Sequence, residues 1–390
     1  MQKKIKICAL TTISKTMDWF VVDSMRNLAN NGYDVTLVCD MDEDFVDRNS
    51  DFANCVPVKM ARGIDFKGAI NGILTFYKLF KQNNFDIIQY STPNAALYSS
   101  IAGALAKIPV RIYGQWGIRY VTFIGFKKFI FKTLEKITCL FSTHVKAVSF
   151  KNRQFAITEN LCSSDKIAVI GIGGTVGVDF TEFDINKKDA YRREIRENFN
   201  ISDDDFVFGF VGRLNVDKGI NELIEAFKDI ENAKLMLVGM LDDDYGPSKE
   251  NLEFAKNNPN IIMTGNVPTD QVCKYLSCFD ILVHPTYREG FGKVLQESMA
   301  MCCPIITTNI PGPSEVIENE ISGILVPVKN SVALKNEMLS LMRDADRRQR
   351  YTNAGRMRAE KYFERSVMLN NILEEYNKIL KVAPKEKVKI

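Results

Sequence analysis

The stretch from Glu289 to Glu297 reads Glu-Gly-Phe-Gly-Lys-Val-Leu-Gln-Glu and holds two carboxylates with seven residues between them. A helix that begins near Gly292 would place Glu289 just before its N-terminus and Glu297 about a turn and a half inside it. The unpaired N–H groups and the positive dipole end of such a helix form a site for a diphosphate. One carboxylate can then contact a sugar while the other reaches a ribose. The segment therefore predicts a site for a sugar nucleotide.

A second polar loop follows the apolar run at residues 206–211. It carries Arg213 and Lys218, five residues apart, in front of another helical pattern. The planar guanidinium and the compact ammonium together suit a diphosphate leaving group. The alternative is that both cations form ordinary surface ion pairs, and this loop alone does not decide between the two.

Apolar, β-branched runs alternate with helical patterns along the whole chain, which is typical of parallel sheets with crossover helices. At 390 residues the chain is longer than one core usually supports. We therefore predict an α/β protein with two Rossmann-like, doubly wound domains. The strands are expected at residues 5–10, 35–39, 87–90, 110–113, 145–148 and 167–170, and then at 206–211, 235–238, 261–263, 281–283, 304–307 and 323–326.

The domain boundaries follow from composition. A glycine- and aspartate-rich linker at residues 171–188 separates an N-terminal domain, 1–180, from a C-terminal domain, 181–365. Residues 366–390 would form a helix and tail that cross back to the first domain, within an amphipathic pattern that begins at Tyr362.

Charge is unevenly divided between the two halves. Residues 1–180 hold 22 Lys and Arg against 15 Asp and Glu, while the rest hold 29 against 33. A basic N-terminal half suits an anionic membrane surface. Nucleic acid is not expected as a partner, because the basic residues are not interleaved with exposed-looking aromatic residues. A merely solvated basic surface remains the alternative.

The nine cysteines are odd in number, lack a Cys-x-x-Cys pair and lie mostly in apolar runs. This pattern favours reduced thiols. The N-terminus has no long apolar stretch followed by a small-residue cleavage site. We expect a cytoplasmic protein that works at the inner face of the plasma membrane.

Five blocks in order resemble the retaining GT-B glycosyltransferases of family 4, the group-1 glycosyltransferases of capsule and lipopolysaccharide synthesis. The resemblance covers most of residues 200–330 and is more diffuse before them, at residues 117–120, 148–149 and 177–179. The blocks are Gly212-Arg213 with Lys218-Gly219, residues 285–292, the Glu289/Glu297 pair, residues 311–315 and residues 323–327.

This resemblance implies two domains facing a cleft, the first binding the acceptor and the second a nucleoside-diphosphate sugar, which we expect to be UDP-linked. Arg213 and Lys218 would hold the phosphates, Glu289 the transferred sugar and Glu297 the ribose. Arg213, Lys218 and Glu289 would serve catalysis, with the departing phosphate accepting the proton of a glycan or lipid-linked acceptor. The rest of the donor loop would be Gly212, Gly290, Phe291, Gly292, Lys293 and Val294.

Two family features are missing from the first half. The turn after the first strand reads Thr-Thr-Ile-Ser-Lys-Thr at residues 11–16, where many relatives have paired glycines. Gln115 and Trp116 stand where a histidine is often found. Of the two histidines in the chain, His144 and His284, we expect both to be packed or hydrogen-bonded structural residues without a chemical role.

Neither a metal nor a cofactor is expected. The acidic clusters at residues 42–44, 203–205 and 242–244 lie where carboxylates cap helices or turns. The glycine-rich run at residues 166–177 is not followed by a helical pattern, which argues against a nicotinamide dinucleotide.

Three alternatives stay open. The segment 123–141 carries Lys128, Lys132 and Lys136 beside several phenylalanines and would either lie on an anionic bilayer or pack on its own sheet. The enzyme could instead be a UDP-sugar 2-epimerase on the same fold. A non-catalytic sugar-binding protein is the third reading.

Overall fold

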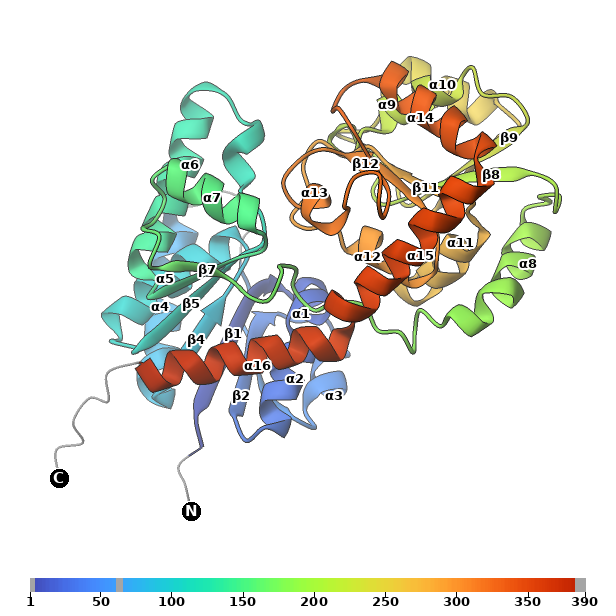
Figure 1. Cartoon of the computed structure of the whole chain (residues 1–390). Coiled ribbons are helices and arrows are strands. Elements are labelled where there is room, and N and C mark those ends of the chain that lie inside the picture. The colour runs from blue at the N-terminus through green and yellow to red at the C-terminus, as the bar shows by residue number, and fades with distance from the viewer. Residues whose placement is uncertain (1–3, 61–65, 383–390) are drawn as a thin grey trace, which may run out of the picture. The chain divides into compact units, whose positions relative to one another are not determined.

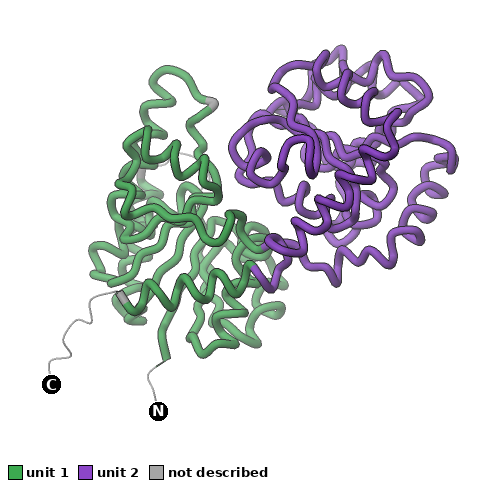
Figure 2. Tube along the Cα trace, viewed as in Figure 1, with its two compact units in different colours: residues 1–176, 368–390 green, residues 177–367 purple. Residues whose placement is uncertain are grey.

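A computed structural model describes residues 4–60 and 66–382, so the charged tail expected after residue 383 lies outside the described residues. The chain forms two compact units (Figure 2). Unit 1 comprises the chain up to Val176 and again from Met368, and unit 2 comprises Gly177–Val367.

Unit 1 is built on a seven-stranded parallel sheet in the order β3-β2-β1-β4-β5-β6-β7 (Figure 1). Its strands are β1 (Lys6–Ile13), β2 (Asp34–Asp40), β3 (Ala53–Pro57), β4 (Ile87–Tyr90), β5 (Val110–Gln115), β6 (His144–Ala147) and β7 (Ile167–Val169). Residues of α4 (Phe66–Asn83), α5 (Pro93–Leu105), α6 (Gly125–Phe141) and α7 (Phe150–Thr158) share one core with the sheet. The other face packs against α1 (Ser14–Phe20), α2 (Val22–Asn30), α3 (Phe45–Asn49) and α16 (Arg365–Val382).

Unit 2 repeats this architecture with six parallel strands in the order β10-β9-β8-β11-β12-β13. The strands are β8 (Phe206–Val211), β9 (Ala233–Val238), β10 (Ile261–Gly265), β11 (Ile281–His284), β12 (Ile305–Thr308) and β13 (Ile324–Val326). The helices are α8 (Lys188–Asn198), α9 (Ile220–Phe227), α10 (Lys249–Asn257), α11 (Val272–Cys278), α12 (Lys293–Ala300), α13 (Pro313–Val316), α14 (Ser331–Arg343) and α15 (Ala345–Tyr362).

The strand order of unit 2 reverses between β8 and β11. In open parallel sheets, ligands bind beyond the carboxyl ends of the strands at such a switch point. The loops that leave these two strands are Gly212–Gly219 and Pro285–Gly292. The fold therefore brings together the two loops in which the sequence predicts the donor site.

The predicted strands are present, but the last predicted helix is divided. The pattern from Tyr362 onward belongs to α15 and α16, which are separated at Phe363 and Glu364. The side chain of Glu364 accepts hydrogen bonds from the N–H groups of Ser366 (2.8 Å) and Val367 (3.2 Å), so it caps the new helix. Periodicity alone misses this break because Phe363 is apolar and fully buried, as a helical core residue would be.

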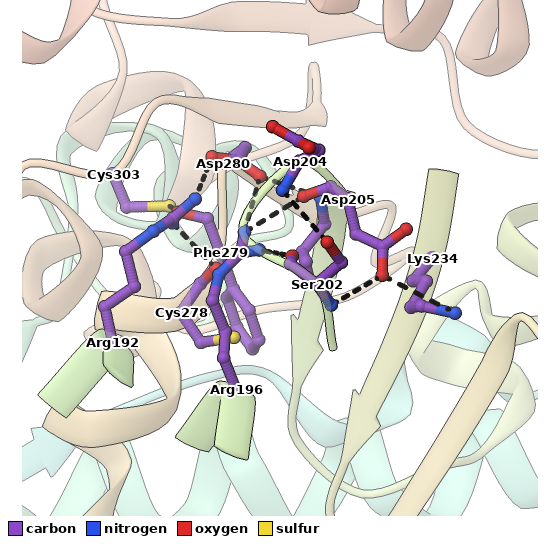
Figure 3. A network of polar contacts seen from close by, with 11 residues as sticks. Arg192, Arg196, Ser202, Asp204, Asp205, Lys234, Cys278, Phe279, Asp280 and Cys303 are labelled. Atoms are coloured by element: carbon purple, nitrogen blue, oxygen red, sulfur yellow. Dashed lines mark hydrogen bonds and ion pairs between the residues drawn. The ribbon is translucent and has the colours of Figure 1, made fainter. Parts of the chain in front are cut away.

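A partly buried polar network fixes the opposite, amino-terminal edge of the unit 2 sheet (Figure 3). Arg192 and Arg196 of α8 contact the two carboxylate oxygens of Asp280, at 3.0 and 3.4 Å. The same carboxylate accepts the N–H of Val207 at 2.8 Å, at the start of β8. Arg196 is only 2% exposed and also donates to the Asp205 carbonyl at 3.0 Å. Asp280 thus ties α8 to the two strands that carry the predicted site.

Candidate active site

Contacts between the loops after β8 and β11 bring the predicted residues together. Gly219 has φ +69°, and a Cβ there would lie 2.0 Å from the Pro285 carbonyl oxygen, so only glycine permits this approach. The N–H of Tyr287 donates to the Asp217 carbonyl at 2.7 Å. The Arg288 guanidinium pairs with the Asp217 carboxylate at 3.0 Å. This arrangement places Lys218 beside the loop that carries Glu289.

Lys218 and Glu289 form an ion pair at the switch point, with side chains 24% and 21% exposed. His284 lies behind them, with its Nε2 3.6 Å from Oε2 of Glu289. Burial raises the pKa of Glu289, but the opposing causes, of which the charge of the neighbouring Lys218 ammonium is the largest, hold that pKa well below its ordinary value. Glu289 is therefore ionised at neutral pH and can accept hydrogen bonds from sugar hydroxyls.

Arg213 lies at the more open side of the same loop. Its side chain is 64% exposed and its guanidinium is 3.6 Å from the Asp242 carboxylate. Asp242 also accepts a hydrogen bond from Asn215 at 3.4 Å, and Asn215 in turn caps the short helix that ends at Lys218. Each predicted phosphate-binding cation thus has an acidic partner, as the ion-pair alternative also predicts.

The Gly290–Glu297 segment turns into a helix as predicted. Gly292 has φ +96° and is followed by α12, in which Lys293 pairs with Glu297 at 3.3 Å. Glu297 is only 8% exposed. Phe291 is buried and packs edge-on against Phe363, with ring centroids 5.8 Å apart. Its side chain therefore anchors the loop, and only its backbone is available to line a diphosphate site.

Close backbone packing also shapes this turn. A Cβ on Gly312, which has φ +90°, would lie 2.6 Å from the Gly290 carbonyl oxygen. Val294, in the first turn of α12, is partly buried. The N–H groups of Leu295 and Gln296 bond to the Gly292 carbonyl at 3.1 and 3.4 Å, whereas those of Lys293 and Val294 come before any intrahelical acceptor. The turn can therefore present backbone donors to an anion.

Sequence reasoning missed three residues near this site. Asp242 was expected only to cap a turn; it does accept the N–H of Tyr245 at 3.0 Å, but it also pairs with Arg213. Glu182, in the predicted linker, interacts electrostatically with Lys293 and Glu297. His284 was assigned no role and lies against Glu289. An acidic partner for Arg213 could have been looked for in the sequence. The contacts of Glu182 and His284 could not, because they depend on tertiary packing.

The remaining acidic clusters serve local structure. Asp42 accepts a hydrogen bond from Ser14 at 2.7 Å, and Asp205 accepts the N–H of Ser202 at 2.9 Å. Within residues 4–60 and 66–382, no group of three histidine, cysteine or acidic side chains is placed to hold a metal ion. His144 is half-buried and hydrogen-bonds through Nδ1 to Thr143 at 2.9 Å, as a structural residue would.

Unit 1 contains a pocket where α5, β5 and α6 meet. The Glu135 carboxylate at this pocket accepts hydrogen bonds from the Tyr113 hydroxyl at 3.0 Å and from the Gln115 amide at 2.7 Å. Burial raises the pKa of Glu135. Gln115 is fully buried. Gln115, which stands where relatives often have a histidine, thus hydrogen-bonds to the Glu135 carboxylate within unit 1.

The start of α6 and the residue before it expose large apolar side chains on unit 1. Ile124, Phe126 and Phe129 are 87%, 76% and 66% exposed. Lys132, by contrast, pairs with Glu159 at 2.7 Å, so the predicted lysine stripe is partly engaged within the unit. In the part of the chain that the structure describes, no helix has the length and apolar content to span a bilayer.

Comparison with known proteins shows the family of the chain. The family model described as "Glycosyl transferases group 1" matches residues 191–358, and "Glycosyl transferase 4-like" matches residues 6–149. The capsular polysaccharide biosynthesis glycosyltransferase CapM of Staphylococcus aureus is 31% identical over 97% of this chain and 98% of its own length. A Campylobacter jejuni enzyme, N,N'-diacetylbacillosaminyl-diphospho-undecaprenol alpha-1,3-N-acetylgalactosaminyltransferase, is 27% identical over 78% of this chain and 80% of its own.

Among solved structures, Anabaena HepE in complex with UDP-glucose superposes with a TM-score of 0.76 at 17% identity, covering 96% of this chain and 100% of its own. This likeness supports the fold, whereas the assignment to a family rests on the full-length match to CapM. The chain therefore belongs to the group 1 glycosyltransferases and has the GT-B fold.

Proposed function

We propose that the chain is a retaining, metal-independent glycosyltransferase that takes a sugar from a UDP-sugar. The observation that carries this proposal is the meeting of Lys218 and Glu289 at the switch point of unit 2, next to the start of α12. One group can neutralise a phosphate, and the other can accept hydroxyl hydrogen bonds from the sugar. UDP is the proposed nucleotide because HepE, of the same fold, was crystallised with UDP-glucose.

The proposed chemistry relies on electrostatic stabilisation. As the glycosidic bond breaks, negative charge grows on the departing phosphate, where Lys218, Arg213 and the first N–H groups of α12 would stabilise it. The same phosphate would accept the proton of the attacking hydroxyl on the same face of the sugar, which gives retention. Three cations, Arg213, Lys218 and Lys293, would take the place of a divalent ion.

Unit 1 would bind a glycan or lipid-linked acceptor of a surface polysaccharide. Two relatives support this assignment by their names, since CapM is a capsular polysaccharide enzyme and the Campylobacter enzyme acts on an undecaprenol-linked sugar. Such acceptors would place the enzyme at the cytoplasmic face of the membrane.

Peripheral membrane contact would then use the exposed tip of α6. Ile124, Phe126 and Phe129 could enter the interface while the neighbouring Lys127 and Lys128 meet anionic headgroups. Wild-type protein should co-sediment with phosphatidylglycerol vesicles at low salt, and a Phe126→Ser, Phe129→Ser variant should stay largely in the supernatant. Equal sedimentation of the two proteins, or no binding by wild type, would remove the membrane contact.

Acceptor-dependent release of UDP tests the proposed reaction. Purified protein should release UDP from one member of a UDP-sugar panel only when a lipid-linked acceptor is added, with or without EDTA. Proton NMR of the product should show the anomeric configuration of the donor. Formation of the C2 epimer of the donor sugar without acceptor would instead favour the epimerase, and binding without turnover would favour the sugar-binding protein.

A further inference from the structure

His284 occupies an unusual position for a histidine. It ends β11 at the carboxyl edge of the unit 2 sheet and is only 1% exposed. Its ring stacks on Phe210 of the neighbouring strand, with centroids 5.3 Å apart and planes at 15°. The His284 carbonyl accepts hydrogen bonds from the Thr307 hydroxyl at 2.8 Å and the Thr286 N–H at 2.9 Å. The backbone and the ring plane are therefore both fixed.

Within the described residues, neither ring nitrogen of His284 has a hydrogen-bond partner, although both are buried. Buried polar groups are rarely left unpaired because desolvating them is costly. Nε2 lies 3.6 Å from Oε2 of Glu289, just beyond hydrogen-bonding distance. A small rotation of the Glu289 side chain would close this gap.

In the proposed reaction, two anionic groups compete for the Lys218 ammonium. The ammonium contacts Glu289, yet the same ammonium would have to neutralise the donor diphosphate. A carboxylate whose cationic partner turns toward a phosphate needs another donor to keep its orientation. The buried imidazole behind Glu289 is placed to be that donor.

We propose that His284 is a positioning residue whose Nε2–H fixes the Glu289 carboxylate toward the hydroxyls of the donor sugar. The inference rests on the proposed function and extends it, because it separates recognition of the sugar from recognition of the diphosphate. Burial lowers the pKa of His284, although Glu289 opposes this, so a neutral ring with one N–H is the form in play. Packing alone would be met equally well by a phenylalanine.

Two variants separate positioning from packing. His284→Phe keeps the ring stacked on Phe210 and removes the donor, whereas His284→Gln restores an N–H at a similar distance from the backbone. His284→Phe should weaken UDP-sugar binding about tenfold by calorimetry while changing UDP binding by less than about twofold. His284→Gln should recover most of the loss. Equal binding of the UDP-sugar by wild type and His284→Phe, or equal losses for UDP and UDP-sugar, would overturn the proposal.

A second readout does not depend on activity. The chain has only two histidines, so ¹⁵N-imidazole NMR of the full-length protein gives two sets of signals, which a His144→Gln variant assigns. Glu289→Gln should shift the His284 signals and leave those of His144 unchanged. Unmoved His284 signals would contradict the contact. Failure of wild type to bind any UDP-sugar would instead count against the proposed function, and the NMR result would still decide the contact.

Discussion

The site is internally balanced in charge at the level of single residues. Arg213 pairs with Asp242, Lys218 with Glu289 and Lys293 with Glu297. A diphosphate can enter such a site only by exchanging partners with these carboxylates. In the proposed site these pairs would therefore tune the affinity for an anionic donor, and Glu289 stays ionised.

Loss of either cation that is proposed to bind phosphate should slow the reaction. Lys218→Ala or Arg213→Ala is expected to lower turnover about a hundredfold, because each removes a preorganised charge from the developing phosphate. Steady-state kinetics with UDP release as the signal measures this effect. Lys335→Ala is the matched control, since Lys335 pairs with Asp229 at 2.9 Å within the same unit. Near-normal turnover in either site variant, with the control unchanged, would refute that residue's role.

The ionised state of Glu289 should also make the thermal stability of the protein depend on pH. Its folded pKa lies below the unfolded value of about 4.3, so its stabilising contribution is complete above that pH and is lost as pH falls through the folded pKa. Below about pH 4.3, the melting temperature of wild type should therefore fall more steeply than that of Glu289→Gln. Thermal unfolding between pH 3 and pH 7 measures both curves. Parallel curves would show that Glu289 is not held ionised by its neighbours.

At the scale of elements, the sequence predicts most strands and places the loops after β8 and β11 where the structure has them. An apolar run locates β8 at the observed bounds, because this strand is short, buried and strongly patterned. Edge strand β3 is missed because its residues are only partly buried or exposed and lack that pattern. Asp242 and His284 could not be joined to the site, since their contacts depend on strand order and on a ring buried beneath Glu289.

Gly219 tests the contact between the loops. Gly219→Ala should destabilise the protein by about 2–4 kcal/mol and impair UDP binding, because its Cβ would lie 2.0 Å from the Pro285 carbonyl oxygen. Gly265→Ala provides a matched control, with φ +70° and nothing within 4 Å of its Cβ, and should cost only about 1 kcal/mol. Urea unfolding of both variants gives the comparison. Equal costs would mean that the close approach to Pro285 is unimportant.

Asp280 tests the network at the other edge of the sheet (Figure 3). Asp280→Ala leaves the buried Arg196 without its carboxylate and should cost about 3–5 kcal/mol of unfolding free energy. UDP affinity of the folded protein should change little, since Asp280 lies at the amino-terminal edge of the sheet. Denaturant unfolding together with UDP titration separates the two effects. A stable variant, or a folded one that no longer binds UDP, would contradict this division.

At the scale of the whole molecule, the chain leaves unit 1 after Val176 and returns to it at Met368. The returning helix α16 packs on unit 1, where the Tyr33 hydroxyl donates to Asn377 at 3.0 Å. All donor-site contacts described above lie within unit 2. The sequence predicts two doubly wound domains and a segment, residues 366–390, that crosses back to the first; the structure packs α16 on unit 1.

Binding of UDP compared with uridine tests the central claim, that a diphosphate docks at Lys218 and the start of α12. Isothermal calorimetry should show that wild type binds UDP far more tightly than uridine. Lys218→Ala should lose about tenfold or more in affinity for UDP and almost none for uridine. Equal affinity of wild type for the two ligands, or unchanged UDP affinity in Lys218→Ala, would contradict the account.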